Sequence, residues 1–294
     1  IDENKIFFSL CQNNYIELVN FHLKTKKEEF ENYFNVPNMS NEIIYELLKE
    51  LKLDAVYYLL LKFDSLSAGF FHYNKQITKI ALPPTIKSIS NDAFTNCLNL
   101  MYISIPSSVT SIGMSAFYSC KSLKEITIPS SITTIPRYAF FGCSSLTTIK
   151  FSAPSSLTSI SDFSFCCSSL KSILIPPTVA LIGSSAFNGC KFLKQVVIPS
   201  SVNKISSYAF NICSSLTYIK IPYFVKEISD CSFRACSLLT QISLPSSVSK
   251  IGGGLFADCP NLNKISIYQC KEKRIEMFED KFLVFKSDSK SENY

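Results

Sequence analysis

The chain repeats one pattern of apolar and polar positions every 23 residues, with a single interval of 24 between Leu146 and Leu170. Each unit has the order Leu-x-x-Ile-x-Ile-Pro, then two more apolar positions, then Ala-Phe-x-x-Cys, as residues 123–143 show best. A fixed period of this length indicates a solenoid, because one unit cannot bury its apolar face alone. The residues that mark the start of each unit are Ile77, Leu100, Leu123, Leu146, Leu170, Leu193, Leu216, Leu239 and Leu262.

The first half of each unit predicts a short β-strand. Ile126 and Ile128 alternate with Thr127, which is the period of a strand with one buried face. Proline then ends the strand because it has no N–H to donate to a neighbouring strand. This proline recurs at Pro83, Pro106, Pro129, Pro176, Pro199, Pro222 and Pro245.

The second half of each unit predicts columns of stacked side chains. We expect a helical turn at Ala139-Phe140 that directs a ring into the core, and a small buried thiol at Cys143. The phenylalanine column is Phe94, Phe117, Phe140, Phe165, Phe187, Phe210, Phe233 and Phe256. The cysteine column is Cys97, Cys120, Cys143, Cys167, Cys190, Cys213, Cys236 and Cys259. At residues 252–254 three glycines replace part of the pattern, and we interpret them as a loosened turn.

The strand side chains that flank each buried Ile should point outward and form an exposed face. Most of these positions are small or polar, but Leu174, Val197 and Tyr218 are apolar or aromatic and lie close to Lys220. Tyr223 and Phe224 replace the small polar pair that follows the proline in most other units. We therefore hypothesise that these six residues form a partner-binding site, with neutral drift or self-contact as the alternative.

The unit resembles the leucine-rich repeat of BspA-like surface proteins of bacteria and parasitic protists. The resemblance covers residues 77–267 and depends on the proline after the strand and on the Ala-Phe-x-x-Cys turn. The Asn that is usual in other leucine-rich repeats is missing. The resemblance implies an α/β-type leucine-rich-repeat solenoid with a concave parallel sheet, and roles in adhesion and in binding host or matrix proteins, without naming a ligand.

The chain divides into three parts. Residues 1–74 have apolar residues at helical spacing and predict an all-α region that caps the solenoid; its residues 54–62 are faintly similar to an ankyrin helix. Residues 75–270 hold eight full repeats and the start of a ninth. Residues 271–294 predict a C-terminal cap followed by a polar tail.

Composition and charge exclude several kinds of chemistry. Residues 77–270 carry 15 basic and 6 acidic side chains, but scattered lysines are typical of solubility, and we expect no nucleic-acid partner. The repeat, rather than a ligand motif, sets the spacing of the cysteines, so we predict no metal site and no cofactor. The two histidines, His22 and His72, lie outside the repeats, and we predict no catalytic residues and no enzymatic activity.

The sequence therefore predicts a non-catalytic solenoid that binds a protein through its sheet face. The resemblance favours an adhesion protein, displayed or secreted, whose partner is a host or matrix macromolecule. Free thiols and the absence of a visible signal peptide favour the alternative, a cytoplasmic scaffold with an intracellular protein partner. No apolar run is long enough for a transmembrane segment. The sequence does not determine the oligomeric state.

Overall fold

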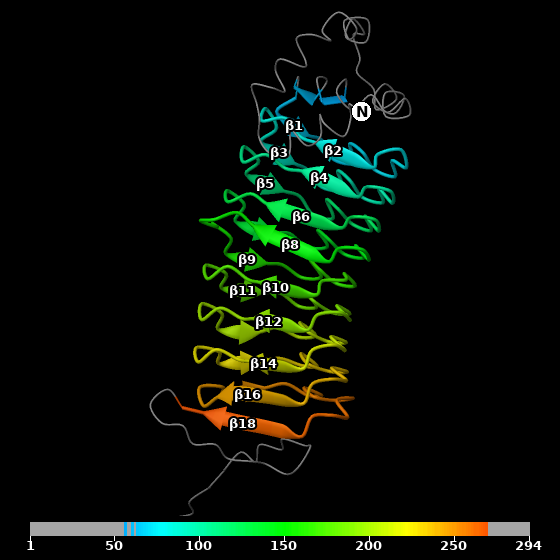
Figure 1. Cartoon of the computed structure of the whole chain (residues 1–294). Helices are drawn as coiled ribbons and strands as arrows, with labels where there is room; N and C mark the ends of the chain where they lie inside the picture. The colour runs from blue at the N-terminus through cyan, green and yellow to red at the C-terminus, as the bar shows by residue number, and fades with distance from the viewer. Residues whose placement is uncertain (1–55, 58–59, 62, 270–294) are drawn as a thin grey trace, which may run out of the picture.

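A computed structural model of the chain describes residues 56–57, 60–61 and 63–269. Figure 1 shows these residues as a single stack of coils, with successive repeats lying one above the other from β1 to β18. Parallel strands of adjacent coils pair residue for residue, for example Ile126 with Ile149 and Ile242 with Ile265. Equivalent positions of the repeat therefore form straight columns through the core.

One side of the stack, the long-strand face, carries the predicted strands. It is built from β2 (Lys79–Ala81), β4 (Tyr102–Ser104), β6 (Glu125–Ile128), β8 (Thr148–Phe151), β10 (Ser172–Leu174), β12 (Gln195–Val197), β14 (Tyr218–Lys220), β16 (Gln241–Pro245) and β18 (Lys264–Tyr268). Hydrogen bonding divides it into three parallel pieces, β2-β4-β6-β8, β10-β12 and β14-β16-β18. This confirms the prediction of a parallel-sheet solenoid with a repeat of about 23 residues.

A second parallel sheet, the short-strand face, is formed by the second of the two apolar positions that follow the proline, together with the residue before it. Its strands are β1 (Ser65–Leu66), β3 (Ser88–Ile89), β5 (Ser111–Ile112), β7 (Thr134–Ile135), β9 (Ser159–Ile160), β11 (Leu181–Ile182), β13 (Lys204–Ile205), β15 (Glu227–Ile228) and β17 (Lys250–Ile251). Each is two residues long and buries its second residue wholly or in part. β1 pairs with β3, so the parallel ladder includes residues upstream of residue 75.

The third side, the turn face, contains the Ala-Phe-x-x-Cys segments, and here the prediction of a helical turn is wrong. N–H groups bond alternately within and between coils: the Tyr118 N–H donates to Ser115 at 2.9 Å, whereas that of Phe117 donates to Ala139 of the next coil at 2.9 Å. Residues with positive φ, such as Tyr138 and Gly142, bracket the turn. Residues 63–269 contain no α-helix, so the described solenoid is not of the predicted α/β type.

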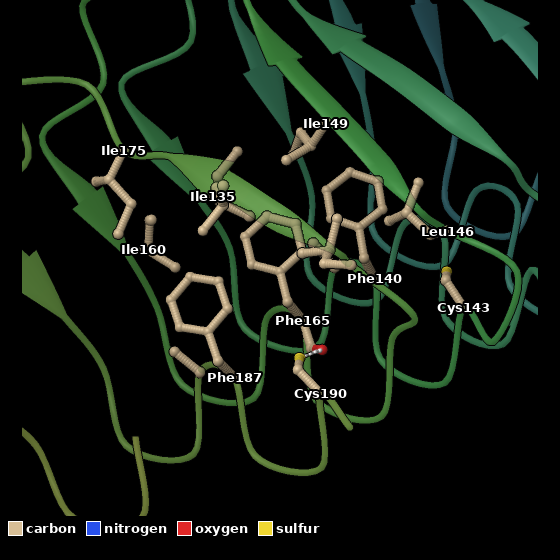
Figure 2. Packing of buried hydrophobic residues seen from close by; sticks show 14 of the residues in the cluster. Ile135, Phe140, Cys143, Leu146, Ile149, Ile160, Phe165, Ile175, Phe187 and Cys190 are labelled. Atoms are coloured by element: carbon tan, nitrogen blue, oxygen red, sulfur yellow. Dashed lines mark hydrogen bonds between the residues drawn. The ribbon is translucent and has the colours of Figure 1, made fainter. Parts of the chain in front are cut away.

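The phenylalanine column forms a continuous stack of rings in the core (Figure 2). Phe117 and Phe140 lie 5.3 Å apart between ring centroids with their planes 1° apart, and Phe165 continues the stack at 5.3 Å from Phe140. The stack begins at Phe71, one coil before the first predicted member. Its rings from Phe71 to Phe233 are almost completely buried, which confirms that the column is core.

The cysteine column differs from the prediction at one coil. Compared with the other coils, this coil has two more residues before its phenylalanine, Phe165, and one fewer after it. The buried position three residues after the ring is therefore occupied by Ser168 and not by Cys167. Cys167 instead has a positive φ and an exposed side chain. Ser168 takes the place of a thiol in the column, and its Oγ lies within hydrogen-bond distance, 3.3 Å, of the Sγ of Cys190 in the next coil.

The buried thiols are free and have hydrogen-bond partners. Each thiol of the column donates to the carbonyl oxygen of a phenylalanine in the preceding coil, at 3.1 Å both from Cys143 to Phe117 and from Cys190 to Phe165, and Figure 2 shows the bond of Cys190. The buried Cys166 instead has its Sγ 3.6 Å from that of Cys167. Burial raises the pKa of Cys143 and of Cys190 to about 12, because a thiolate would lose its hydration there. The described cysteines form no disulfides.

Gly252 does not lie in a loosened turn. A Cβ at this position would lie 2.3 Å from the backbone nitrogen of Asp230 in the preceding coil, and the Asp230 carboxylate accepts a hydrogen bond of 2.7 Å from the Gly253 N–H. The same arrangement joins Gly183 to Asp162. Asn91 bonds the Met114 N–H in the same way, next to Gly113. An Asp or Asn side chain that caps a backbone N–H of the next coil thus brings that coil so close that only glycine fits at the residue before the capped N–H.

The predicted terminal regions lie mostly outside the described residues. This applies to the helices predicted over residues 1–74, of which residues 56–57, 60–61 and 63–74 are described, and to the cap over residues 271–294. Residues 63–74 contain β1 and turns and no helix. Their boundaries and capping roles stay predictions. In the described part of the chain, the structure shows no helix with the length and apolar character that a bilayer crossing requires.

Candidate partner-binding face

The hypothesised site lies on the long-strand face, where two of its aliphatic side chains are direct neighbours. Leu174 on β10 and Val197 on β12 are paired in parallel register, and they are 75% and 61% exposed. Alternation along each strand explains this, because Ile173 and Val196 take the buried positions. The two side chains therefore form a continuous apolar surface in contact with water.

β14 extends this surface with an aromatic ring and a cation. β12 packs against β14 without a hydrogen-bonded ladder, and Tyr218 is 42% exposed. The repeat period places Lys220 in the same row as Val197, and its Nζ lies 5.4 Å from the ring centroid of Tyr268. Five apolar and aromatic residues with one lysine thus extend from β10 to the turn after β14.

The last two predicted residues lie after Pro222, where the chain leaves the long-strand face. Phe224 is 59% exposed, whereas Tyr223 is half-buried and its ring contacts that of Phe224 edge to face at 5.8 Å. The backbone carbonyl of Tyr223 also accepts a hydrogen bond from Ser247 of the next coil. Tyr223 therefore supports the Phe224 ring more than it offers a surface of its own.

Sequence reasoning missed Phe192, which is 57% exposed and directly precedes the buried Leu193. The signal was present, since Ser122, Ser145, Ser169 and Ser215 occupy this position in other coils. The coil that carries Val197 therefore has a second exposed apolar side chain. Apolar exposure is not confined to this face, because Leu181 on the short-strand face is 49% exposed.

Two glutamates, one on each sheet face, form ion pairs with lysines. Glu125 pairs with Lys150 at 3.5 Å on the long-strand face. On the short-strand face the carboxylate of Glu227 lies 2.9 Å from Lys204 and 3.3 Å from Lys250. The hydrogen bond to Lys204, with those to Ser229 and Lys250, lowers the pKa of Glu227 to about 2. These lysines are therefore engaged within the protein.

The described residues show no constellation that suggests catalysis or metal binding. No group of three or more His, Cys, Asp or Glu side chains converges in this part of the chain. The one described histidine, His72, stacks on the ring of Tyr73 at 4.2 Å. His22 lies outside the described residues.

A sequence model of the BspA type leucine rich repeat region matches residues 64–191 and 158–283, with 6 copies of the repeat. The chain belongs to this family. The BspA-type match confirms the resemblance drawn from the strand-ending proline and the Ala-Phe-x-x-Cys turn. A comparison with curated protein sequences finds no match.

The solved structures similar to this BspA-type chain include three from bacteria. A leucine rich cell surface protein of Faecalibacterium prausnitzii is 23% identical, with 72% of this chain and 78% of that one covered and a TM-score of 0.38. A leucine-rich repeat protein of Bacteroides ovatus is 25% identical, with 68% and 81% covered and a TM-score of 0.30. The pneumococcal vaccine antigen PcpA is 21% identical, with 65% and 62% covered and a TM-score of 0.41.

Proposed function

We propose that this BspA-type solenoid is an adhesion protein that binds a host or matrix protein through its long-strand face. The observation that carries the proposal is the exposed pair Leu174 and Val197, which lie in register on a face whose other outward positions are mostly small or polar. Burying a fully exposed aliphatic side chain stabilises a complex by about 1.5–3 kcal/mol. The pair therefore offers a hydrophobic centre for an interface.

The remaining proposed contacts surround this centre. Tyr218 and Phe224 add exposed rings, a side-chain type enriched at binding hot spots, and Lys220 adds a charged rim. Tyr223 holds the Phe224 ring in place. The strands of the neighbouring coils provide a rigid support, so a partner would bind without a large ordering cost in this chain.

An intracellular scaffold is the second candidate, and the free thiols favour it. Ten described cysteines are unpaired, and eight of them are buried. Disulfides are common in secreted proteins and rare in reducing compartments. A scaffold could use the same long-strand face, so the two candidates differ in partner and place and not in the binding surface.

Photo-crosslinking at Val197 tests this proposal. A photoreactive phenylalanine derivative at Val197 should form adducts with matrix or host-cell surface proteins, and the same residue at Leu181, on the short-strand face, should form about tenfold fewer. Adducts formed only with cytosolic proteins of the source cells would favour the scaffold. Equal yields from both positions would contradict a site on the long-strand face.

A further inference from the structure

Three lysines near the proposed site have no acidic partner within the described residues. Lys171, Lys194 and Lys220 are exposed, and none of them forms an ion pair with a described carboxylate. Among the described lysines, only Lys150, Lys204 and Lys250 have a described carboxylate within 3.5 Å, so the unpaired state is common and it is the position of the three lysines near the site that matters. The charges around the site are therefore left for a partner to neutralise.

These lysines lie in the two coils that carry the apolar pair and in the coil that follows them. Lys171 and Lys194 each lie three residues before Leu174 and Val197, a separation of about 10 Å along an extended strand. Lys220 follows Val197 in the next coil of the same row. No Asp or Glu occurs in the long-strand segments at residues 170–176, 193–199 and 216–222. The patch is thus apolar at its centre and positively charged at its rim.

This charge distribution distinguishes between possible occupants. Two copies of the chain joined through this patch would bring lysines of both copies together, which costs binding energy. Nucleic acid is bound mainly through phosphate contacts, and a centre of Leu and Val offers it none. A protein segment with both apolar and acidic side chains satisfies the centre and the rim together.

We propose that the partner presents an acidic segment, in which one or two large aliphatic or aromatic side chains are flanked by Asp or Glu. The apolar side chains cover Leu174 and Val197, and the carboxylates pair with Lys171, Lys194 and Lys220. This inference rests on the proposed function, because it names the chemistry of the partner at the same site. It also predicts that binding weakens as salt concentration rises.

A displayed library of random 12-residue peptides tests the inference with defined probes. Peptides should be selected on the wild-type protein and then measured against two double variants, Lys171→Glu with Lys194→Glu, and Leu174→Asp with Val197→Asp. We expect the selected peptides to combine Asp or Glu with Leu, Ile or Phe, and to bind the lysine variant at least about tenfold more weakly. Circular dichroism should show that both variants stay folded.

A matched control carries the same charge change away from the patch. Lys87→Glu with Lys121→Glu alters two exposed lysines in coils that precede β7, at least two coils away from β10, and should leave peptide binding within about threefold of wild type. Selected peptides that are neutral or basic, yet lose binding in the Leu174→Asp, Val197→Asp variant, would overturn the acidic segment and leave the proposed site standing. Peptides that bind this apolar variant as well as wild type would overturn the site itself.

Two further measurements separate the other occupants. Binding of a single-stranded or double-stranded oligonucleotide that is lost in the lysine variant would overturn the inference in favour of nucleic acid. A dimer in sedimentation that dissociates in the Leu174→Asp, Val197→Asp variant would overturn it in favour of a second copy. We expect neither oligonucleotide binding nor such a dimer.

Discussion

Replacing Phe165 by Ala should lower the free energy of unfolding by about 3–5 kcal/mol. The ring is fully buried and stacks on Phe140 at 5.3 Å and on Phe187 at 5.4 Å, so truncation removes contacts with both neighbouring coils. Because a repeat array is stabilised by nearest-neighbour interfaces, the loss should concentrate in these coils. Denaturant unfolding gives the energy, and hydrogen exchange shows where protection is lost.

The control for this prediction is Phe224→Ala, which truncates the same side-chain type at an exposed position. It should change stability by no more than about 0.5 kcal/mol. If the two variants unfolded at the same denaturant concentration, the stacked column would not be the main source of cohesion between coils.

Replacing Gly183 by Ala should destabilise the solenoid by about 1–3 kcal/mol or more. The added Cβ would lie 2.6 Å from both the backbone nitrogen and the Oδ1 of Asp162, and backbone atoms cannot move aside as a flexible side chain can. Thermal unfolding of the purified variant measures the effect. Gly253→Ala is the matched control, since its Cβ would meet no atom closer than 3.9 Å, and it should be neutral or slightly stabilising.

A double variant tests the cause of the close approach. Coils whose predecessor lacks the capping Asp or Asn carry larger residues at this position, among them Pro136, Ser161, Ser206 and Ser229. Gly183→Ser with Asp162→Ser should therefore be more stable than Gly183→Ser alone. If the second substitution instead made the protein less stable, the capping carboxylate would not be what draws the two coils together.

Periodicity was sufficient to predict the stacked columns and the strands of the long-strand face, because burial on one side of a strand leaves a period of two in the sequence. Periodicity did not predict the strands of the short-strand face, because each is only two residues long and cannot show a period of two. It also did not reveal the turn face, where Tyr138 and Ile212 adopt positive φ although such residues are rare in that conformation.

The cysteine column shows where alignment by sequence alone fails. Counting from Leu146 to Leu170 places Cys167 in the core, whereas the structure aligns the coil on Phe165 and buries Ser168. The large ring fixes the register because it has more apolar surface to bury than a thiol has. The residue three positions after the ring, here Ser168, is then buried whatever its type.

The candidate site was predictable in part. Alternation places Leu174, Val197 and Tyr218 outward, and the structure shows all three exposed. Phe192 was missed because it lies before the strand, where alternation does not apply. The unpaired state of Lys171 and Lys194 depends on which carboxylates lie nearby in space, and this required the packing of the coils.

The central claim is that the long-strand face binds a protein through its apolar pair, and the affinity of one double variant tests it most directly. With the partner captured by crosslinking at Val197, Leu174→Asp with Val197→Asp should weaken binding at least about 100-fold, the equivalent of roughly 3 kcal/mol. Leu181→Asp, on the short-strand face, should stay within about threefold of wild type. Equal affinity of the double variant and the wild-type protein, both folded, would contradict the account.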